Sequence, residues 1–98
     1  MPLHHVALFR WQPEATPEQI AAVTPALQAL AATLSGVRSY ACGASTGATP
    51  TAYDYGVIAE FEDKAAWDVY MADEEHDRIR SELIAPIVAE RAGIQLDA

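Results

Sequence analysis

The sequence predicts a single α+β domain in which helices cover one face of an antiparallel sheet, with the elements in the order β-α-β-β-α-α-β. Three observations lead to this prediction. The chain has 98 residues, which is the length of one domain. Its apolar residues alternate with polar ones in some segments, as in strands, and recur every three or four residues in others, as in helices. No repeat, linker or charge block divides the chain, so residues 1–98 are expected to form one domain.

The first strand and the start of the first helix have clear boundaries. Leu3 to Trp11 is an apolar run too short for a typical helix, and Gln12-Pro13 closes it, so we expect a strand. Thr16-Pro17-Glu18-Gln19 combines a capping residue, an early proline and a glutamine that can complete a capping box. A helix is therefore expected to begin here.

This first helix carries an apolar stripe and an internal proline. Pro25 removes one backbone donor and predicts a kink or a local restart at Thr24. Ser35-Gly36 is expected to stop the helix. The apolar stripe consists of Ile20, Val23, Leu27, Leu30 and Leu34.

Two further strands are expected in the middle of the chain. Val37 to Ala44 is the second strand, and the small, turn-forming residues from Ser45 to Thr51 mark a loop. Tyr53 to Phe61 is the third strand, because its residues alternate between an apolar face and a second face. The apolar face consists of Tyr53, Tyr55, Val57, Ala59 and Phe61.

The last third of the chain predicts two short helices and a terminal strand. Glu62-Asp63 begins the first helix, and a break near Ala72-Asp73 separates it from the second. Gly93 is expected to end the second helix, and Ile94 to Asp97 to form the last strand. The apolar stripes of the two helices are Trp67, Tyr70 and Met71, and then Ile79, Leu83 and Ile87.

Composition and charge exclude several classes of function. The hydrophobic fraction of 51 % includes 20 alanines, so few large side chains remain to build a core. Six Lys+Arg against 14 Asp+Glu give a net charge of −8, whereas nucleic-acid binding needs a clustered basic surface. No apolar run reaches the roughly 20 residues of a membrane span, and the N-terminus lacks signal-peptide features, so a cytoplasmic location is expected. Cys42 is the one cysteine, so neither an internal disulfide nor a Cys-based metal site is predicted.

The first strand has large apolar residues on both faces, which indicates a partner. If its odd positions face the helices, Val6 and Leu8 lie on the opposite face together with Ile58. Two such sheets stacked across a two-fold axis would bury these residues in a homodimer. The alternative is that they are ordinary scattered surface aliphatics.

Four segments carry a combination of motifs that covers most of the chain. They are the opening Leu3 to Trp11, the region around Gly43, the strand Tyr53 to Phe61 with its Glu62-Asp63 exit, and the stretch from Trp67 to His76. Together they resemble the stress-responsive dimeric α/β-barrel proteins called Dabb domains. The resemblance implies a ferredoxin-like fold that pairs into a dimeric α/β barrel.

Within that family the sequence is most similar to the olivetolic acid cyclase type, which closes a linear polyketide thioester by aldol condensation without a cofactor. The similarity implies a reactive histidine at His76, six residues after Tyr70, and a further histidine of the site at His5. The sequence departs from this type at two places. The histidine on the third strand of the cyclase falls at Tyr55, and the common His-Pro-x-His turn reads Asp73-Glu74-Glu75-His76.

His76 and Tyr70 are also candidates on spacing alone. His76 begins the apolar stripe of its helix and therefore faces the core. Tyr70 would lie about 120° away from it in one unbroken helix, but a break near Ala72-Asp73 lets the two converge. The alternatives are a buried histidine satisfied by a carbonyl or by Tyr70, and a core tyrosine whose hydroxyl reaches the surface. The helix dipole and the nearby carboxylates act in opposite directions, so the direction of the His76 pKa shift is not predicted.

His5 shares a strand face with Ala7 and Phe9, whereas His4 points to the other face. His5 and His76 have no evident third ligand, so no metal is predicted, and the resemblance implies that no cofactor is needed. Alanines along the first helix leave room for a cavity and equally suit close packing of helix on sheet. These are Ala22, Ala26 and Ala31.

These residues and the resemblance together imply a cofactor-free cyclase or lyase that acts on a β-polyketone or a related carbonyl compound. His76 is assigned as the general base, Tyr70 as the donor to the enolate oxygen or the residue that orients the base, and His5 as a polar contact to the substrate. One alternative is a non-catalytic, small-molecule-binding stress protein, and another is a cofactor-independent monooxygenase, for which no oxygen site is evident. The expected partners are a small molecule and a second copy of the chain, with no nucleic acid and no membrane. The expected substrate-binding residues are Ala7, Phe9, Tyr55, Val57 and Trp67.

Overall fold

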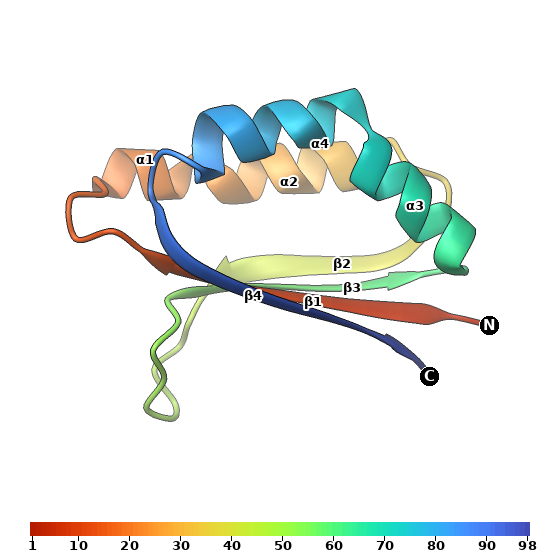
Figure 1. Ribbon diagram of the computed structural model, residues 1–98, viewed down its shortest axis with the longest axis horizontal. Coiled ribbons are helices and arrows are strands. Elements are labelled where there is room, and N and C mark those ends of the chain that lie inside the picture. Colours follow the sequence, from red (N-terminus) through yellow and green to blue (C-terminus); the bar gives the residue numbers. More distant parts are fainter.

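A four-stranded antiparallel sheet with a layer of helices on one face makes up the molecule (Figure 1). The computed structural model describes residues 1–98. Its strands lie in the order β2-β3-β1-β4, and the sheet of one chain is open. The predicted order of strands and helices is confirmed. The elements are β1 (Leu3–Trp11), α1 (Pro17–Ala21), α2 (Val23–Ala32), β2 (Val37–Ala44), β3 (Tyr55–Phe61), α3 (Lys64–Ala72), α4 (Glu74–Ile79), the π-helical turn η1 (Arg80–Ile84) and β4 (Val88–Asp97).

The odd-numbered residues of β1 face the helix layer and share the core with β3. Ala7 lies opposite Val57, and His5 lies opposite Ala59, so each pair occupies the same inner face. The buried residues of β3 alternate as predicted, although the strand begins at Tyr55 rather than two residues earlier. The two central strands therefore present a line of side chains to the helices above them.

The first helix is split in two near its proline. Thr16 Oγ1 accepts a hydrogen bond from the Gln19 amide at 3.2 Å, and the Gln19 side chain accepts one from the Thr16 amide at 2.9 Å, so the predicted capping box is confirmed. The last residue of α1 lies four positions before Pro25, and α2 begins at Val23 rather than at Thr24. The break lies there because the proline ring clashes with the carbonyl four residues earlier and has no N–H to donate to it.

Gly36 has a packing role instead of the helix-stopping role that we expected. The helix α2 ends at Ala32, and Gly47 is the one residue with a positive φ. A Cβ added to Gly36 would lie 2.5 Å from the Cβ of Ala66. The glycine therefore lets α3 approach the start of β2 closely.

The predicted break between the last two helices is confirmed at Asp73. The helix α3 ends at Ala72, and Asp73 has an extended backbone. The Asp73 carboxylate caps α4, since it accepts hydrogen bonds from the amides of Glu75 at 2.8 Å and His76 at 3.1 Å. His76 is thereby fixed in the first turn of α4.

The buried stripe of the last helix differs by one residue from the prediction. Ile79 is followed on the buried face by Ile84 rather than by Leu83, which is half-buried. The difference arises because α4 continues into the π-helical turn η1, which has more residues per turn than an α-helix. No helix in the layer is both long and apolar enough to cross a membrane.

The last strand is longer than predicted, and the expected role of Gly93 was wrong. β4 begins at Val88 rather than at Ile94 and pairs with β1 along its length. Gly93 lies inside this strand, opposite Ala7, and ends no helix. The helix ends earlier because Pro86 cannot continue it.

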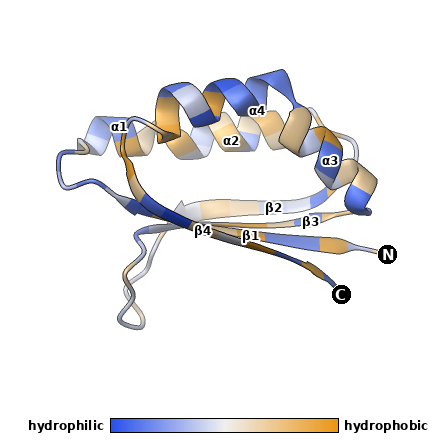
Figure 2. Ribbon diagram, viewed as in Figure 1, coloured by the Kyte–Doolittle hydropathy of each residue, from blue (hydrophilic) through white to orange (hydrophobic).

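The outer face of the sheet is apolar although no helix covers it. Val6 and Leu8 are half-buried, and Ile58 is 62 % exposed. Ile94 and Leu96 on β4 are also at least half exposed, and Figure 2 shows hydrophobic colour on this C-terminal part of β4. The predicted apolar face is present, and Ile94 and Leu96, which pair with Val6 and His4, make it larger than expected.

Candidate functional site

A cavity of about 470 Å³ lies between the inner face of the sheet and the helices α3, α4 and η1. Ten of its 16 lining residues are hydrophobic, and a mostly apolar lining with a few polar groups is the character of a small-molecule site. His5, Tyr70 and His76 all line this cavity. The structure thus brings together the three residues that the sequence singled out, from β1, α3 and α4.

His76 is buried in the cavity wall as a neutral imidazole. Its Nδ1 lies 3.0 Å from the backbone carbonyl oxygen of Tyr70, and because a carbonyl can only accept, Nδ1 carries the proton and donates it. Burial, and after it the charge of Arg80, lowers the pKa of His76 to about 4, although the bond to the carbonyl and the charge of Asp73 raise it. At neutral pH the ring therefore has a lone pair on Nε2 that can accept a proton.

Tyr70 packs against His76 and is held by a second tyrosine. The rings of Tyr70 and His76 stack with centroids 4.0 Å apart and planes 28° apart. The Tyr70 hydroxyl lies 2.9 Å from that of Tyr40, and because the residue is 2 % exposed the hydroxyl does not reach the surface. Burial raises the pKa of both phenols, so both keep their protons at neutral pH. One hydroxyl donates to the other, and when Tyr40 is the donor, the proton of Tyr70 is left for a ligand in the cavity.

His5 is held in the opposite tautomer by two donors. Its Nδ1 lies 3.3 Å from the indole nitrogen of Trp67 and 3.0 Å from the side-chain nitrogen of Gln95. Since an indole N–H can only donate, Nδ1 is the acceptor and Nε2 carries the proton. Burial lowers the pKa of His5, which favours this neutral form. Its ring centroid lies 5.8 Å from that of Tyr70.

The cavity therefore contains one imidazole that can accept a proton and one that can donate a hydrogen bond. His76 has its free lone pair on Nε2, whereas His5 has its proton on Nε2. Both imidazoles lie against Tyr70, and a base and a donor in one cavity are the two groups that proton abstraction beside a carbonyl requires. The structure contains no group of three or more His, Cys, Asp or Glu side chains that could hold a metal ion.

The five expected substrate-binding residues separate into two groups. Trp67 lies outside the cavity lining and donates to His5. Tyr55 also lies outside it, because its hydroxyl is 2.5 Å from Thr24 Oγ1 and its ring packs 5.4 Å from that of Trp11. The three that line the cavity are Ala7, Phe9 and Val57.

Four residues of the site were not anticipated from the sequence: Tyr40, Arg80, Arg91 and Gln95. Arg80 follows His76 by four residues, and this spacing of about one helical turn could have marked it. Arg91 was missed because β4 was predicted too short, whereas Gln95 lies within the predicted strand and was not singled out. Their pairing with Phe9 and His5 places both on the inner face.

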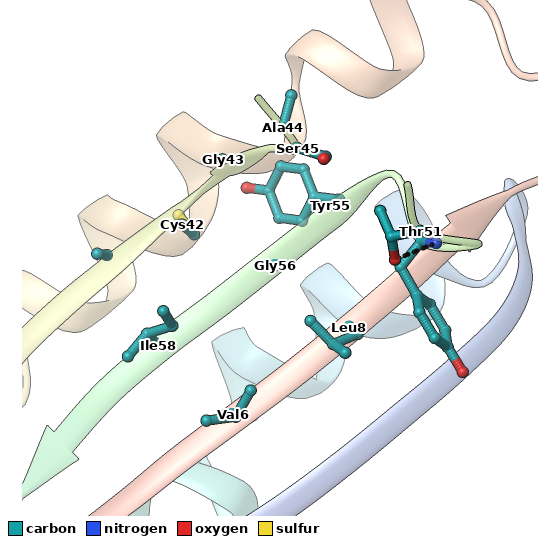
Figure 3. Close-up of a pocket in the computed structure, with 12 residues that line it drawn as sticks. Val6, Leu8, Cys42, Gly43, Ala44, Ser45, Thr51, Tyr55, Gly56 and Ile58 are labelled. Carbon is teal, nitrogen blue, oxygen red and sulfur yellow. Dashed lines mark hydrogen bonds between the residues drawn. The ribbon is translucent and has the colours of Figure 1, made fainter. Parts of the chain in front are cut away.

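A second hollow, of about 390 Å³, lies on the outer face of the sheet (Figure 3). Val6, Leu8 and Ile58 contribute to its floor, and Ser45 and Thr51 belong to the loop at its rim. Its lining contains no histidine, carboxylate or guanidinium group. The outer hollow therefore lacks the acid and base groups that the inner cavity has.

Comparison with solved structures finds relatives that match nearly all of the chain. A dimeric ferredoxin-like protein of unknown function from Thermobifida fusca is 33 % identical, with a TM-score of 0.90 over 100 % of this chain and 92 % of that one. A dimeric ferredoxin-like protein of unknown function from Jannaschia is 24 % identical, with a TM-score of 0.85 over 100 % of both chains. A hydroxynitrile lyase from Passiflora edulis is 11 % identical, with a TM-score of 0.83 over 97 % of this chain and 91 % of that one, and shares the fold alone. No curated protein matches the sequence.

The family assignment follows from the extent of the sequence match. Residues 3–96 match the stress responsive A/B barrel domain, a span that includes every strand and helix except the last residue of β4. The same span contains the four segments whose motifs suggested this family. The chain therefore belongs to the stress responsive A/B barrel, or Dabb, domain family.

Proposed function

We propose that this protein is a cofactor-free cyclase or lyase that closes a ring in a β-polyketone or a related carbonyl compound. The observation that supports this proposal most directly is the neutral His76 in a mostly apolar cavity, with its Nε2 unprotonated and the ring of Tyr70 stacked against it. In a β-polyketone the terminal carbon beside a carbonyl group loses a proton to a base when donors stabilise the enolate oxygen, and attack by this carbon can close a six-membered ring. The cavity is the place where such a compound would bind.

In the first step His76 Nε2 takes a proton from this carbon, and the electron pair of the C–H bond moves onto the carbonyl oxygen to give an enolate. The low pKa of His76 keeps Nε2 of the imidazole unprotonated but also makes it a weak base. Donors at the enolate oxygen must therefore supply much of the stabilisation. Tyr70 and the Nε2–H of His5 are the donors proposed for this task.

In the second step the enolate carbon attacks another carbonyl carbon of the same molecule. One carbon–carbon bond forms, and the electron pair of the attacked C=O bond becomes an alkoxide, which takes back the proton from the His76 imidazolium. The ring product has the same atoms as the substrate, so the step consumes no co-reactant. The rate of the proton transfer in the first step depends on His76 Nε2 lying within about 3 Å of the carbon that loses the proton.

The proposed active form is a homodimer joined through the outer face of the sheet. Ile58, Ile94 and Leu96 are at least half exposed there in a single chain, and two-fold stacking of two sheets would bury them. The relative from Thermobifida fusca is also dimeric. The inner cavity would stay open to a ligand, because it lies on the other side of the sheet.

The test is a ring-closure assay with heptanetrione, a neutral compound whose three ketones are separated by single methylene groups. Ring closure and loss of water give a methylresorcinol, which mass spectrometry and NMR detect. His76→Ala and His76→Gln should each lower the rate by about 10²–10⁴-fold, the usual contribution of a general base. The glutamine variant can still donate to the Tyr70 carbonyl, so it separates loss of the base from loss of that bond.

His4→Ala is the matched control, because His4 lies on the opposite face of the same strand. It should keep the wild-type rate, with circular dichroism and mass measured in parallel. If both His76 variants keep full activity, the assignment of the base is wrong. If the wild-type protein binds the triketone without converting it, the protein is a small-molecule-binding member of the family instead.

A further inference from the structure

The inner cavity has a positive charge although the whole protein is acidic. The net charge of the chain is −8, yet no Asp or Glu is among the residues that line the cavity. Its charged and titratable lining consists instead of two arginines, two histidines and a tyrosine. An uneven distribution of this kind favours a ligand that carries a negative charge.

Arg80 has hydrogen-bonding capacity that the protein does not use. Its Nη2 donates to the Met71 carbonyl at 3.2 Å, and the carboxylate nearest to it, that of Asp77, is 3.5 Å away and mostly exposed. Its Nε is buried and has no partner. A buried donor without an acceptor costs free energy, and a bound anion would satisfy it. Arg80 also begins the π-helical turn η1, a distortion that is frequent at functional sites.

Arg91 supplies a second guanidinium on the same cavity. It lies on the inner face of β4, opposite Phe9, and lines the cavity. The other five Lys and Arg side chains of this protein all form salt bridges, and Arg91 forms none. Gly93, the next residue on that face, has no side chain to fill the space beside it. The two arginines therefore reach the cavity from opposite layers of the fold.

We propose that the ligand of this cavity is a keto acid whose carboxylate is bound by Arg80 and Arg91. The inference rests on the proposed function and narrows its substrate class. A planar guanidinium matches the two oxygens of a carboxylate. Arg80 lies one helical turn beyond His76, so the carboxylate would be held a few carbon atoms from the carbon that loses its proton. A carboxylate fits better than a phosphate, because the lining is mostly apolar and no glycine-rich loop supplies backbone amides to a phosphate.

The test compares levulinate, a stable keto acid, with levulinamide, its neutral analogue, by NMR titration of the dimer. The wild-type protein should bind the acid at least about tenfold more tightly, the value of one charge-assisted hydrogen bond. Arg91→Gln and Arg80→Gln should each remove about tenfold of the affinity for the acid and leave the affinity for the amide unchanged. Arg78→Gln, which removes the same charge from the exposed side of α4, is the control and should change neither.

Arg91 is exposed on an edge strand, so its variant keeps the test decisive even if Arg80→Gln does not fold. Arg80→Lys keeps the positive charge but not the planar pair of N–H donors, so it should show an intermediate loss of affinity for the acid. The proposal is overturned if the acid binds no better than the amide, if neither binds, or if Arg91→Gln weakens both equally. Tighter binding of methyl phosphate than of levulinate would overturn the choice of carboxylate. Ring closure of the neutral heptanetrione is measured separately, so a wild-type protein that prefers the acid but closes no ring contradicts only the proposed function.

Discussion

His4 and His5 are neighbours in the sequence but belong to different parts of the molecule. His4 lies on the outer face of β1, partly exposed and 3.8 Å from the carboxylate of Glu60. His5 lies on the inner face, 7 % exposed, where Trp67 and Gln95 donate to its Nδ1. The difference follows from the two-residue period of a strand. The chemistry available to a histidine is set here by the face it occupies rather than by its place in the sequence.

The same contrast holds for the two faces of the whole sheet. The inner face borders a cavity with two histidines, a tyrosine and two arginines. The outer face has a hollow lined mainly by apolar residues, without a histidine, carboxylate or guanidinium group. One four-stranded sheet therefore separates a surface suited to chemistry from a surface suited to association. Substitutions on one face should leave the property of the other unchanged.

The largest expected effect concerns association. Ile58→Glu places a carboxylate on the proposed interface, and the two-fold axis of a homodimer introduces it twice. Burial of an unpaired charge costs several kcal/mol, so we expect self-association to weaken by about a thousandfold or more. The folded chain should tolerate the change because Ile58 is exposed. Light scattering and circular dichroism should therefore show a folded monomer at concentrations where the wild-type protein is dimeric.

Val69→Glu is the control for this prediction. Val69 is a similarly exposed aliphatic residue, but it lies on α3 and not on the sheet. This variant should remain dimeric. A wild-type protein that is monomeric at micromolar concentration, or an Ile58→Glu protein that dimerises like the wild type, would contradict the assignment of the outer face.

A smaller effect is expected within the inner face. Tyr70→Phe should lower ring closure by about tenfold, since one donor is lost while the shape of the ring is kept. Tyr40→Phe should cost less, because Tyr40 acts on the substrate only through its hydrogen bond to the Tyr70 hydroxyl. The double variant should then be no slower than Tyr70→Phe alone. If the two losses multiply instead, Tyr40 acts independently and is not a positioning residue.

Much of the fold follows from local sequence signals. The capping box at Thr16 and the break at Asp73 were predictable because each depends on residues a few positions apart. The break at Asp73 also made the convergence of Tyr70 and His76 predictable, because in one unbroken helix the two side chains would point in different directions around the helix axis. Gly93 misled the prediction because a glycine within a strand and a glycine at a helix end look alike in sequence.

The two cavity arginines and Tyr40 could not be predicted from local sequence signals, because only the tertiary fold brings them to the site. Arg80 on η1 and Arg91 on β4 line one cavity although they are far apart in the sequence, and Tyr40 reaches Tyr70 across the layer between β2 and α3. No periodicity links these positions. The tautomers of His5 and His76 likewise depend on an indole and a carbonyl that the fold places beside them. The identity of the candidate base was thus accessible from sequence, whereas its protonation state was not.

The smallest effect is the pH dependence that His76 imparts to stability. Burial, Arg80 and His5 lower its pKa to about 4, against the opposing influence of Asp73 and the Tyr70 carbonyl. Its ordinary pKa is 6.5, so between these values the unfolded chain binds more protons than the folded one. The contribution of the neutral imidazole to stability is therefore complete above about pH 6.5 and is lost as the pH falls towards 4. Burial shifts His5 in the same direction and adds to this trend.

His76→Gln isolates this contribution, because glutamine does not titrate and can still donate to the Tyr70 carbonyl. Urea unfolding of the wild-type protein should give a free energy of unfolding that falls between pH 6.5 and 5, and the glutamine variant should show a shallower fall over the same range. The dependence of ring closure on pH should follow the same group, since Nε2 keeps its lone pair until the pH approaches 4. An NMR titration that places the pKa of His76 at or above 6.5 would contradict both expectations, and would mean that the inner face does not hold its candidate base in the neutral form.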